Sequence, residues 1–594
     1  MKFHKTLSVN DNAALSRADW PDLLKSIYAF SGSRMWFTFG IVAVASFVEG
    51  LGLVMLLPMA GILFAQTRPD SGVAARFSDI LESFGPEGTL AQLILLSVIF
   101  LIWMALRGVF LVYRDRRLVR LTHGYVDHLR IKMFSSFASA SWPAVRRLPK
   151  AEMFNALTVD LRRVAVAVNF LAKLAITATL SVSYLIVSFT INFAIGLSLL
   201  GLAIVACAVA VIWSRNSGVL GRSLTKGNKK DAFVTTTFLD GLKSAKAYHA
   251  EDVFIQEYAA TIGSLRGIQT AFVMQQGRLR RGVEMFGAIA SVGILLVGFG
   301  VIGIAGAELA VLVVVVVRLT PSLLQSLAGF QSVAFAMPAF VSAQRRMKLM
   351  EKQAVGQADG RRCISGPFML EPAGITLSNA VVELDEAGEG NVLLRVDDLC
   401  LPATGLVHLA GRSGAGKSTF AELIAGLYLP DSGTVRAGEL ALSGDNLAAW
   451  QTRVAFAPQE PFLFNGTVLE NLTWPNSKAD TASVWHALAA AGADQLVRSL
   501  PDGLSQALQD GGSRLSGGER QRLCLARALL RPSAVLIIDE GLSAVEPDLE
   551  REILGRLKIL GQEKLVLCVN HSPVIEALAD ATVKIGPQGT AHLV

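Results

Sequence analysis

The chain has 594 residues, too many for a single hydrophobic core, which indicates at least two domains. It is 52% hydrophobic and only 17% charged, with a mean hydropathy of +0.46, so an ordinary soluble composition is excluded. The net charge of +7 does not require nucleic acid, and we expect no such partner, because cytoplasmic loops of membrane proteins also collect Lys and Arg. Five widely spaced cysteines indicate structural thiols in a reducing compartment.

Long apolar runs fill the chain up to about residue 350, and a bilayer-spanning helix needs about 20 mostly apolar residues. The pattern predicts an all-α membrane domain over residues 1–350 that lies in the lipid bilayer. Tight turns are expected at Thr190–Asn192 and at Gly306–Glu308. The six predicted spans are Trp36–Phe64, Thr89–Val112, Leu171–Thr190, Phe193–Trp213, Phe286–Ile304 and Leu309–Ala328.

Basic residues orient these spans. The segments Arg114–Arg163 and Arg215–Arg281 are rich in Arg and Lys, whereas the loop Thr67–Glu87 leans acidic. By the positive-inside rule, both basic segments and both termini are cytoplasmic. The sequence thus predicts a multi-pass protein of the cytoplasmic (inner) membrane, with cytoplasmic helices that extend its spans.

A short amphipathic stretch precedes the first span. It begins at Asp19 and places Leu23, Leu24, Ile27 and Tyr28 on one helical face. This pattern predicts an interfacial helix on the cytoplasmic leaflet, and a disordered tail is the alternative.

Four charged residues fall inside the predicted spans, namely Glu49, Arg107, Lys173 and Arg318. Charges in a bilayer are costly, so they indicate function by default. An Arg–Glu pair, such as Arg318 with Glu49, would suit an amphipathic cargo in a wet cavity. The alternatives are a structural ion pair or a side chain that snorkels to the interface. We favour these alternatives for Lys173 and leave both interpretations open for Arg318.

The composition becomes globular after a polar linker at residues 351–365. From residue 366 to 594, strand-like and helical segments alternate, which predicts an α/β nucleotide-binding domain with a parallel sheet.

A glycine-rich turn in this second half carries the strongest signal. It follows the apolar run Leu406–Leu409 and precedes a helical pattern, which is the context of a P-loop. Backbone N–H groups of such a turn bind phosphates, Lys417 reaches the β- and γ-phosphates, and Ser418 binds Mg²⁺. The predicted ATP-binding residues of the turn are Gly411, Arg412, Ser413, Gly414, Ala415, Gly416, Lys417, Ser418 and Thr419.

A second candidate phosphate site lies at Ser516, Gly517 and Gly518, which open another helix. The N-terminus of that helix favours negative charge. Because one nucleotide cannot easily occupy two helix N-termini of one domain, we expect two domains to face each other across the nucleotides.

The apolar strand Val535–Ile538 ends in Asp539 and Glu540, at the strand edge where ligands bind in parallel sheets. Asp539 is predicted to hold Mg²⁺ and Glu540 to act as the general base for the attacking water. Gln459, on a proline-bracketed loop, is a candidate for Mg²⁺ or the water. His571, after the strand Leu565–Val569, is a candidate for the γ-phosphate.

In the order of these motifs the chain resembles an exporter-type half-transporter of the ATP-binding cassette family. Gly411–Thr419 matches Walker A, Gln459 the Q-loop, Leu515–Glu519 the signature, Val535–Glu540 Walker B and His571 the switch histidine. The resemblance implies ATP and Mg²⁺ as cofactors, a second half-transporter as partner, two ATP molecules between the cassettes, and alternating access.

Three positions depart from the family pattern. Leu384 stands where an aromatic residue usually stacks on adenine, and Glu546 replaces the usual Asp after Walker B. The segment Asp510–Arg514 lacks the family's usual glutamate. None of these changes removes Glu540 or His571, so hydrolysis is still expected.

The expected function is ATP-driven export or flipping of a peptide, lipid or amphipathic natural product by a homodimer. An importer of a metal chelate or siderophore built on the same fold is the first alternative. A regulatory or scaffold ATPase is the second, and a heterodimer remains open. The sequence does not name the cargo.

Overall fold

The computed structural model describes residues 19–54, 89–191, 193–297, 300, 306–353, 374–384, 391–443, 446–475, 479–586 and 589–593. The chain divides into two compact units. The helical unit draws on Asn10–Ala138 and Leu148–Lys352, and the α/β unit on Ser139–Arg147 and Gln353–Val594. The short segment Ser139–Arg147 therefore belongs to the α/β unit, although both its neighbours in sequence are helical-unit residues.

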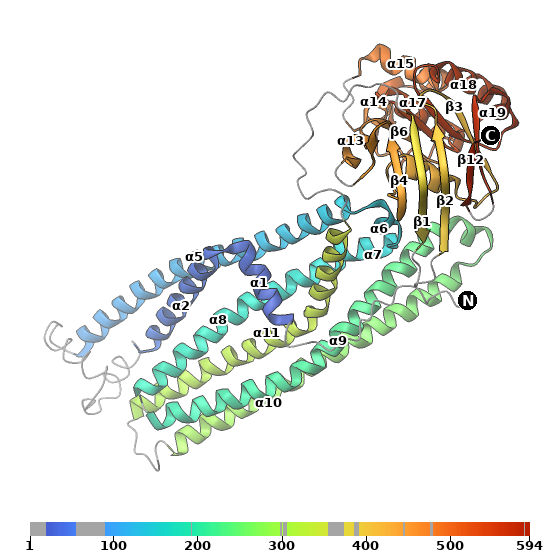
Figure 1. The fold of residues 1–594 in the computed structure, drawn as a ribbon. Helices are drawn as coiled ribbons and strands as arrows, with labels where there is room; N and C mark the ends of the chain where they lie inside the picture. The colour runs from blue at the N-terminus through green and yellow to red at the C-terminus, as the bar shows by residue number, and fades with distance from the viewer. Residues whose placement is uncertain are drawn as a thin grey trace. The chain divides into compact units, whose positions relative to one another are not determined.

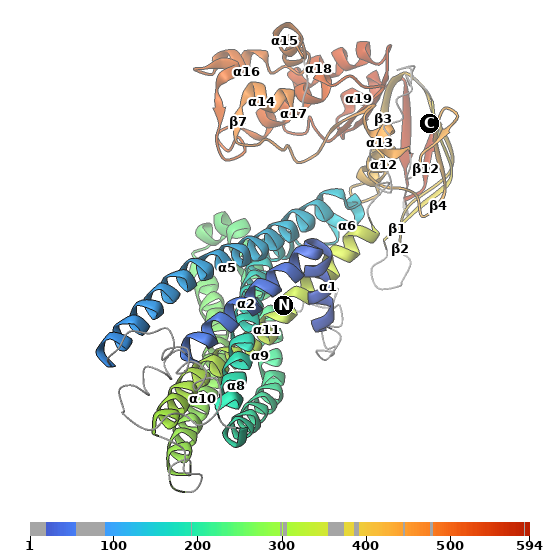
Figure 2. The same cartoon turned by 90° about the vertical axis from the view of Figure 1, so that its left-hand side faces the viewer.

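Long helices make up the helical unit, and those from α8 to α11 run side by side in Figures 1 and 2. The α11 helix packs against both α8 and α9, and α10 packs against α9 and α11. The helices of this unit are α1 (Asp19–Ser31), α2 (Ser33–Val54), α5 (Thr89–Ser139), α7 (Lys150–Asn155), the π-helix η1 (Ala156–Asp160), α8 (Leu161–Ile191), α9 (Phe193–Ala247), α10 (Glu251–Val297) and α11 (Gly306–Lys352).

Each of the six predicted spans overlaps one long helix of the described chain, and the C-terminal parts of the first and fifth spans lie largely outside the described residues. The helices α5, α9, α10 and α11 continue well past the span limits, as expected for extensions of the spans. The predicted turn at Gly306–Glu308 is wrong, because these residues already begin α11. At the other predicted turn, Thr190 and Ile191 are helical, while Asn192 and the loop Thr67–Glu87 lie outside the described residues.

Three helical stretches of the described chain are each long and apolar enough to cross a membrane: Leu93–Ser139, Lys150–Thr190 and Leu312–Lys352. The pair Trp20–Ser31 and Ser33–Glu49 meets the same criterion together, with a bend of 105°. Gly32 makes this bend with φ +53°, a left-handed conformation that glycine adopts readily.

The predicted amphipathic helix exists as α1, but its apolar face is divided. Leu23 and Ile27 are buried in a cluster with Tyr125 and Met133 of α5, whereas Leu24 and Tyr28 are exposed. The helix bundle thus covers Leu23 and Ile27, which leaves only Leu24 and Tyr28 of the predicted apolar face exposed.

The α/β unit contains a six-stranded sheet of order β12-β11-β3-β10-β9-β6, parallel except for β12, and an antiparallel sheet of order β2-β1-β4-β5. In Figure 2, helices α14 to α17 lie on the left of this unit, and strands β1, β2, β4 and β12 lie on the right. The strands are β1 (Ile375–Leu384), β2 (Asn391–Leu401), β3 (Gly405–Gly411), β4 (Ser432–Ala437), β5 (Leu440–Ala441), β6 (Val454–Ala457), β7 (Gly466–Thr467), β8 (Ala507–Leu508), β9 (Val535–Asp539), β10 (Leu565–Val569), β11 (Ala581–Ile585) and β12 (Ala591–Leu593).

The α/β unit also contains ten helical elements among its described residues. They are α6 (Trp142–Arg146), α12 (Lys417–Ile424), α13 (Leu447–Gln451), α14 (Val468–Thr473), α15 (Thr481–Ala490), α16 (Asp494–Ser499), the 3₁₀ turn η4 (Gly503–Ser505), α17 (Gly517–Leu530), α18 (Pro547–Leu560) and α19 (Pro573–Leu578).

The core of the α/β unit lies on both faces of the parallel sheet. In β3, Val407 and Leu409 join a cluster with Phe420 of α12, whereas Leu406 joins a second cluster with Leu525 of α17. This alternation follows from the period of two along a strand. The two buried faces fix the strand ends, and with them the loops that carry the motif residues.

A buried ion-pair cluster joins α11 to α7 and to η1, the two elements just before α8. Arg346 Nη1 lies 3.1 Å from Asp160 Oδ2, and Arg346 Nη2 lies 3.3 Å from Glu152 Oε2. Asp160 is fully buried, and burial raises the pKa of its carboxyl although Arg346 opposes the shift. A buried carboxylate of this kind depends on its cation.

Replacing Arg346 with Met should therefore strand the Asp160 charge. We expect the free energy of unfolding to fall by about 3–5 kcal/mol, the usual cost of removing one partner from a buried pair. The apparent melting temperature of the purified protein measures this loss. Adding Asp160→Asn to Arg346→Met should recover much of it, and the exposed neighbour Arg345→Met should cost under about 1 kcal/mol. An unchanged melting temperature for Arg346→Met would contradict the assignment.

Candidate functional site

The glycine-rich turn joins β3 to α12 and places Lys417 at the first position of that helix. Gly416, the residue before the helix, has φ +104°, and a Cβ there would lie 2.9 Å from the Leu393 carbonyl oxygen. The ammonium of Lys417 donates to the carbonyls of Gly411 at 2.9 Å and Arg412 at 3.2 Å. The turn thus closes around the lysine, in the form expected of a phosphate-binding loop.

Two oxygen ligands meet beside this turn. Ser418 Oγ donates to Asp539 Oδ1 over 3.3 Å, although 121 residues separate them in sequence. Burial raises the pKa of the Asp539 carboxyl and the Glu540 charge adds to that shift, whereas Ser418 and Lys417 oppose it. A buried acid beside a second acid makes a region of negative potential, and a divalent cation would stabilise both.

Glu540, Gln459 and His571 converge at the end of β9. The amide Nε2 of Gln459 donates to Glu540 Oε2 at 2.6 Å, and His571 Nε2 lies 3.7 Å from Glu540 Oε1. His571 Nε2 also lies 3.1 Å from Lys417 Nζ. Glu540 has φ +50°, a backbone conformation that costs a non-glycine residue free energy and is concentrated at functional sites. The candidate base and its candidate partners therefore lie together beside the phosphate loop.

Asn570, which the sequence analysis missed, holds His571 in place. Its Oδ1 accepts hydrogen bonds from the backbone N–H groups of His571 and Ser572, at 2.7 Å and 3.2 Å. Its Nδ2 donates to Glu550 Oε1 at 2.5 Å, and its carbonyl contacts His408 Nε2. Its place directly before His571, at the end of a buried strand, was the only local signal.

The second candidate phosphate site is the N-terminus of α17. Ser516 caps this helix: its Oγ accepts from Glu519 N–H at 3.3 Å, while the Glu519 carboxylate accepts from Ser516 N–H at 2.7 Å. The hydroxyl hydrogen of Ser516 stays available to a ligand in this reciprocal arrangement. Among the described residues, Ser516 makes no hydrogen bond or ion pair with Lys417, Ser418 or Glu540.

Gly518 has a packing role in addition to its expected phosphate contact. A Cβ at Gly518 would lie 2.4 Å from the carbonyl oxygen of Ala544, whereas a Cβ at Gly517 would meet only the Ala544 Cβ at 3.7 Å. The first helical turn of α17 thus lies directly against the segment that follows Walker B. Only a residue without a Cβ permits that approach.

Gly518→Ala should accordingly destabilise the α/β unit, and Gly517→Ala should not. Overpacking typically costs about 1–3 kcal/mol, so the unfolding midpoint of Gly518→Ala should fall clearly below that of the wild type. Differential scanning calorimetry of the two variants without nucleotide measures the difference between their unfolding midpoints. Equal midpoints would show that the helix can move away from Ala544 at no cost.

The backbone positions of the three departures from the family pattern are as follows. Leu384 is the last residue of β1 and pairs with Asn391, and its side chain lies outside the described set. Glu546 is the N-cap residue of α18 and makes no side-chain capping bond. Asp510 has φ +48° in the turn before α17.

Within the α/β unit, the short helix α6 contacts the helix that carries Lys417. Trp142 Nε1 donates to Glu422 Oε1 at 3.1 Å, and Arg146 Nη1 lies 3.3 Å from Glu422 Oε2. Glu422 lies one turn after Ser418 on α12. Burial raises the pKa of the Glu422 carboxyl, with Trp142 and Arg146 opposing the shift. Sequence reasoning missed this contact, because no spacing rule joins residues so far apart.

The intramembrane charges do not pair as expected. Glu49 Oε1 lies 2.6 Å from Arg107 Nη2, so the ion pair of Glu49 is with Arg107 and not with Arg318, the partner considered from the sequence. Arg318 is exposed on α11, and among the described residues it has no hydrogen bond or ion pair. Lys173 lies over the Phe170 ring at 5.8 Å. The placement of α2 beside α5 explains the difference, since it brings Glu49 to Arg107 while Arg318 on α11 stays exposed.

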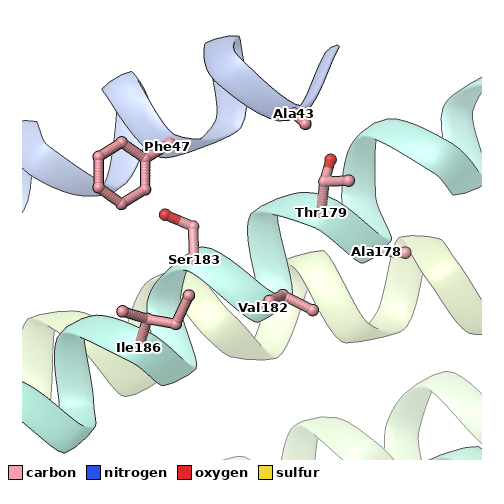
Figure 3. Close-up of a pocket in the computed structure, with 7 residues that line it drawn as sticks. All are labelled: Ala43, Phe47, Ala178, Thr179, Val182, Ser183 and Ile186. Carbon is pink, nitrogen blue, oxygen red and sulfur yellow. The ribbon is translucent and has the colours of Figure 1, made fainter. Parts of the chain in front are cut away.

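A groove of about 290 Å³ lies between α2 and α8, and Figure 3 shows the side chains that line it. A hydrogen bond of 2.7 Å between Ser46 Oγ and Thr179 Oγ1 joins the two helices beside it. None of its lining residues is charged, so the groove suits hydrocarbon. These residues are Ala43, Phe47, Ala178, Thr179, Val182, Ser183 and Ile186.

A membrane-spanning helical unit joined to a P-loop ATPase unit defines an ATP-driven membrane transporter. Residues 70–327 match the family model of the ABC transporter transmembrane region, and residues 394–543 match that of the ABC transporter. Together the two models cover more than half of the chain. The chain therefore belongs to the ABC transporters, with a membrane region and one ATP-hydrolysing domain in a single polypeptide.

Relatives of known description support this assignment. The ATP-dependent lipid A-core flippase of Burkholderia pseudomallei is 25% identical over 539 residues, covering 86% of this chain and 86% of the relative. The flippase of the same name from Ralstonia nicotianae is 26% identical over 463 residues, covering 75% and 74%. The heterocyst differentiation ATP-binding protein HepA of Nostoc sp. is 24% identical over 464 residues, covering 77% and 74%.

A solved structure shares the fold. A bacterial Atm1-family ABC exporter with ATP bound superimposes with a TM-score of 0.76 at 19% identity, covering 95% of both chains. The predicted fold class, a helical transmembrane domain followed by a P-loop ATPase domain, is confirmed. So are ATP binding and ATP hydrolysis coupled to translocation, as activities of this family.

Proposed function

We propose that two copies of this chain form a homodimer that exports or flips an amphipathic cargo across the cytoplasmic membrane. The observation that carries the proposal is the separation of Lys417 from Ser516, because each suits a phosphate but no contact joins them within one chain. A symmetric dimer would bring the α17 N-terminus of one copy to the phosphate loop of the other. Both termini and both ATPase domains lie in the cytoplasm in this proposal.

The proposed domain limits are a membrane domain at 1–350, a linker at 351–365 and a nucleotide-binding domain at 366–594. The proposed phosphate-binding groups are the turn Gly411–Thr419 of one copy and Ser516–Gly518 of the other. Glu540 is the proposed general base, and His571 the proposed γ-phosphate contact.

The residues beside the phosphate loop also fit Mg²⁺. Ser418 and Asp539 offer two hard oxygen ligands in hydrogen-bond contact, and the amide oxygen of Gln459 offers a third from the neighbouring loop. When bound, Mg²⁺ neutralises developing charge on the phosphates. Ser418 and Asp539 orient the phosphate loop toward that position, and Glu540 accepts a proton from water.

Export or flipping is favoured over import by two comparisons. The solved structure with this fold is titled an exporter, and the relatives that match most of the chain include two lipid A-core flippases. The apolar groove between α2 and α8 suits a cargo or lipid with hydrocarbon chains. A metal chelate or siderophore importer would not need such a surface.

Transport in oriented vesicles tests the direction. The purified chain should be reconstituted in liposomes, and a fluorescent short-chain phospholipid followed from the leaflet that faces the ATPase domains. We expect ATP-dependent movement away from that leaflet, and Glu540→Gln liposomes serve as the control. ATP-dependent movement toward the ATPase domains, or uptake of a ferric chelate instead, would support the importer.

A further inference from the structure

Arg318 is a cation in the middle of a membrane span. In the predicted span Leu309–Ala328 it lies nine residues from one end and ten from the other, roughly 14–15 Å at 1.5 Å per residue. Its side chain is exposed on α11, next to the exposed apolar residues Val314 and Val317. An arginine held at this depth costs several kcal/mol unless a water-filled cavity or an anion compensates it.

The predicted spans offer no second acid for this role. The six predicted spans contain a single acidic residue, Glu49, against the basic residues Arg107, Lys173 and Arg318. The next acid on the same helix, Glu308, is ten residues from Arg318 in sequence, roughly 15 Å along α11. In a homodimer the predicted spans contain twice this excess of basic residues. The second copy adds only another Glu49, which is paired with its own Arg107.

Glu49 is already engaged. Its Oε1 lies 2.6 Å from Arg107 Nη2, and the two side chains are only about one-fifth exposed, at 20% and 21%. Tyr184 on α8 lies within electrostatic range of Glu49, Arg107 and Arg318. Arg318 therefore adds a net positive charge beside an ion pair that is already neutral.

Lys173 differs from Arg318 in the two properties that matter. It is the third residue of its predicted span, so its long side chain easily reaches the interface. It also lies over the Phe170 ring, which partly compensates an ammonium. Depth and the lack of a described partner set Arg318 apart.

Hydrogen bonds to α8 fix the part of α11 that carries Arg318. One turn further along α11, Ser322 Oγ donates to the Thr177 carbonyl at 2.9 Å and contacts Ser181 Oγ at 3.0 Å. Ser326 Oγ donates to Thr177 Oγ1 at 2.8 Å. These bonds hold α11 against α8 one turn away from Arg318, so the backbone that carries Arg318 is fixed while its side chain stays exposed.

We infer that Arg318 binds the anionic group of the cargo, and that the cargo is an anionic amphiphile whose phosphate or carboxylate enters the membrane region. This inference rests on the proposed transport function and names its substrate class. A planar guanidinium binds phosphate or carboxylate through two parallel hydrogen bonds, which an ammonium cannot do. The uncompensated charge makes the site selective against zwitterionic and cationic amphiphiles.

Equilibrium binding tests the inference without requiring transport. The full chain is placed in nanodiscs of phosphatidylcholine, and a fluorescent phosphatidylglycerol is titrated and competed with unlabelled phosphatidylglycerol, phosphatidylcholine or inorganic phosphate. We expect the wild type to prefer phosphatidylglycerol over phosphatidylcholine by about tenfold or more, since one charge-assisted hydrogen bond corresponds to at least about that factor. If inorganic phosphate competes and unlabelled phosphatidylglycerol does not, the site binds the free ion. That result would overturn the inference that the ligand is an anionic amphiphile.

Three variants complete the test. Arg318→Met should abolish the preference for the anionic lipid, Arg318→Lys should keep part of it, and Lys173→Met should match the wild type. Melting temperatures identify variants that fail to fold, and Arg318→Gln then replaces Arg318→Met. An undiminished preference in both neutral variants, or an equal loss in Lys173→Met, would overturn the role of Arg318. Selective binding without ATP-driven movement in the liposome assay would instead refute the proposed function and leave this site intact.

Discussion

Glu540→Gln is expected to leave ATP binding intact and to slow hydrolysis by roughly 10²–10⁴-fold, the usual contribution of a general base. Its carboxylate lies at the end of β9, with Gln459 Nε2 at 2.6 Å and His571 Nε2 at 3.7 Å. The amide of Gln occupies the same volume but accepts protons far less readily. Phosphate release at saturating ATP and equilibrium binding of a fluorescent ATP analogue measure the two quantities separately.

The matched control is Glu563→Gln, which removes an exposed acid in the turn after α18. It should hydrolyse ATP at the wild-type rate. The decisive result is the contrast between the two variants. If Glu540→Gln releases phosphate as fast as Glu563→Gln, another group activates the water.

The local parts of the site could be predicted because their signals are contiguous in sequence. A P-loop needs a strand, a glycine-rich turn and a helix in order, and the structure places them in β3, Gly411–Gly416 and α12. The helix N-terminus at Ser516 and the acids at the end of β9 follow the same logic. In each case a few neighbouring residues determine the backbone, and the backbone determines where the side chain points.

Contacts between distant segments could not be predicted in this way. Nothing in the spacing of Glu49 indicates that Arg107 reaches it before Arg318 does, because the rotation of α5 against α2 decides which side chains meet. Asn570 and Glu422 were missed for the same reason, as their partners are 20 and more than 270 residues away. The tight turn expected at Gly306–Glu308 failed differently, since small residues also begin helices.

Mixing two inactive variants should restore ATP hydrolysis if the sites are shared between chains. Lys417→Ala and Ser516→Ala each damage both sites of their own homodimer, because every site takes Lys417 from one copy and Ser516 from the other. A mixed dimer, isolated with two different tags, contains one doubly damaged and one intact site. We expect about half the wild-type rate from it, if the two symmetric sites hydrolyse independently.

A second mixed dimer separates shared sites from coupled sites. Wild type paired with Lys417→Ala has one intact site under any arrangement, so its rate reports whether one site hydrolyses ATP alone. Suppose that this dimer is active while the mixed dimer of Lys417→Ala with Ser516→Ala is inactive. In that case Ser516 does not contact the nucleotide bound by the partner chain. A third dimer pairs the wild type with a chain that carries both Lys417→Ala and Ser516→Ala. If the two chains share each site, this dimer has no intact site. If each site lies within one chain, this dimer keeps one intact site. Activity in the first mixture and its absence in the last would place Lys417 and Ser516 on opposite sides of the same ATP.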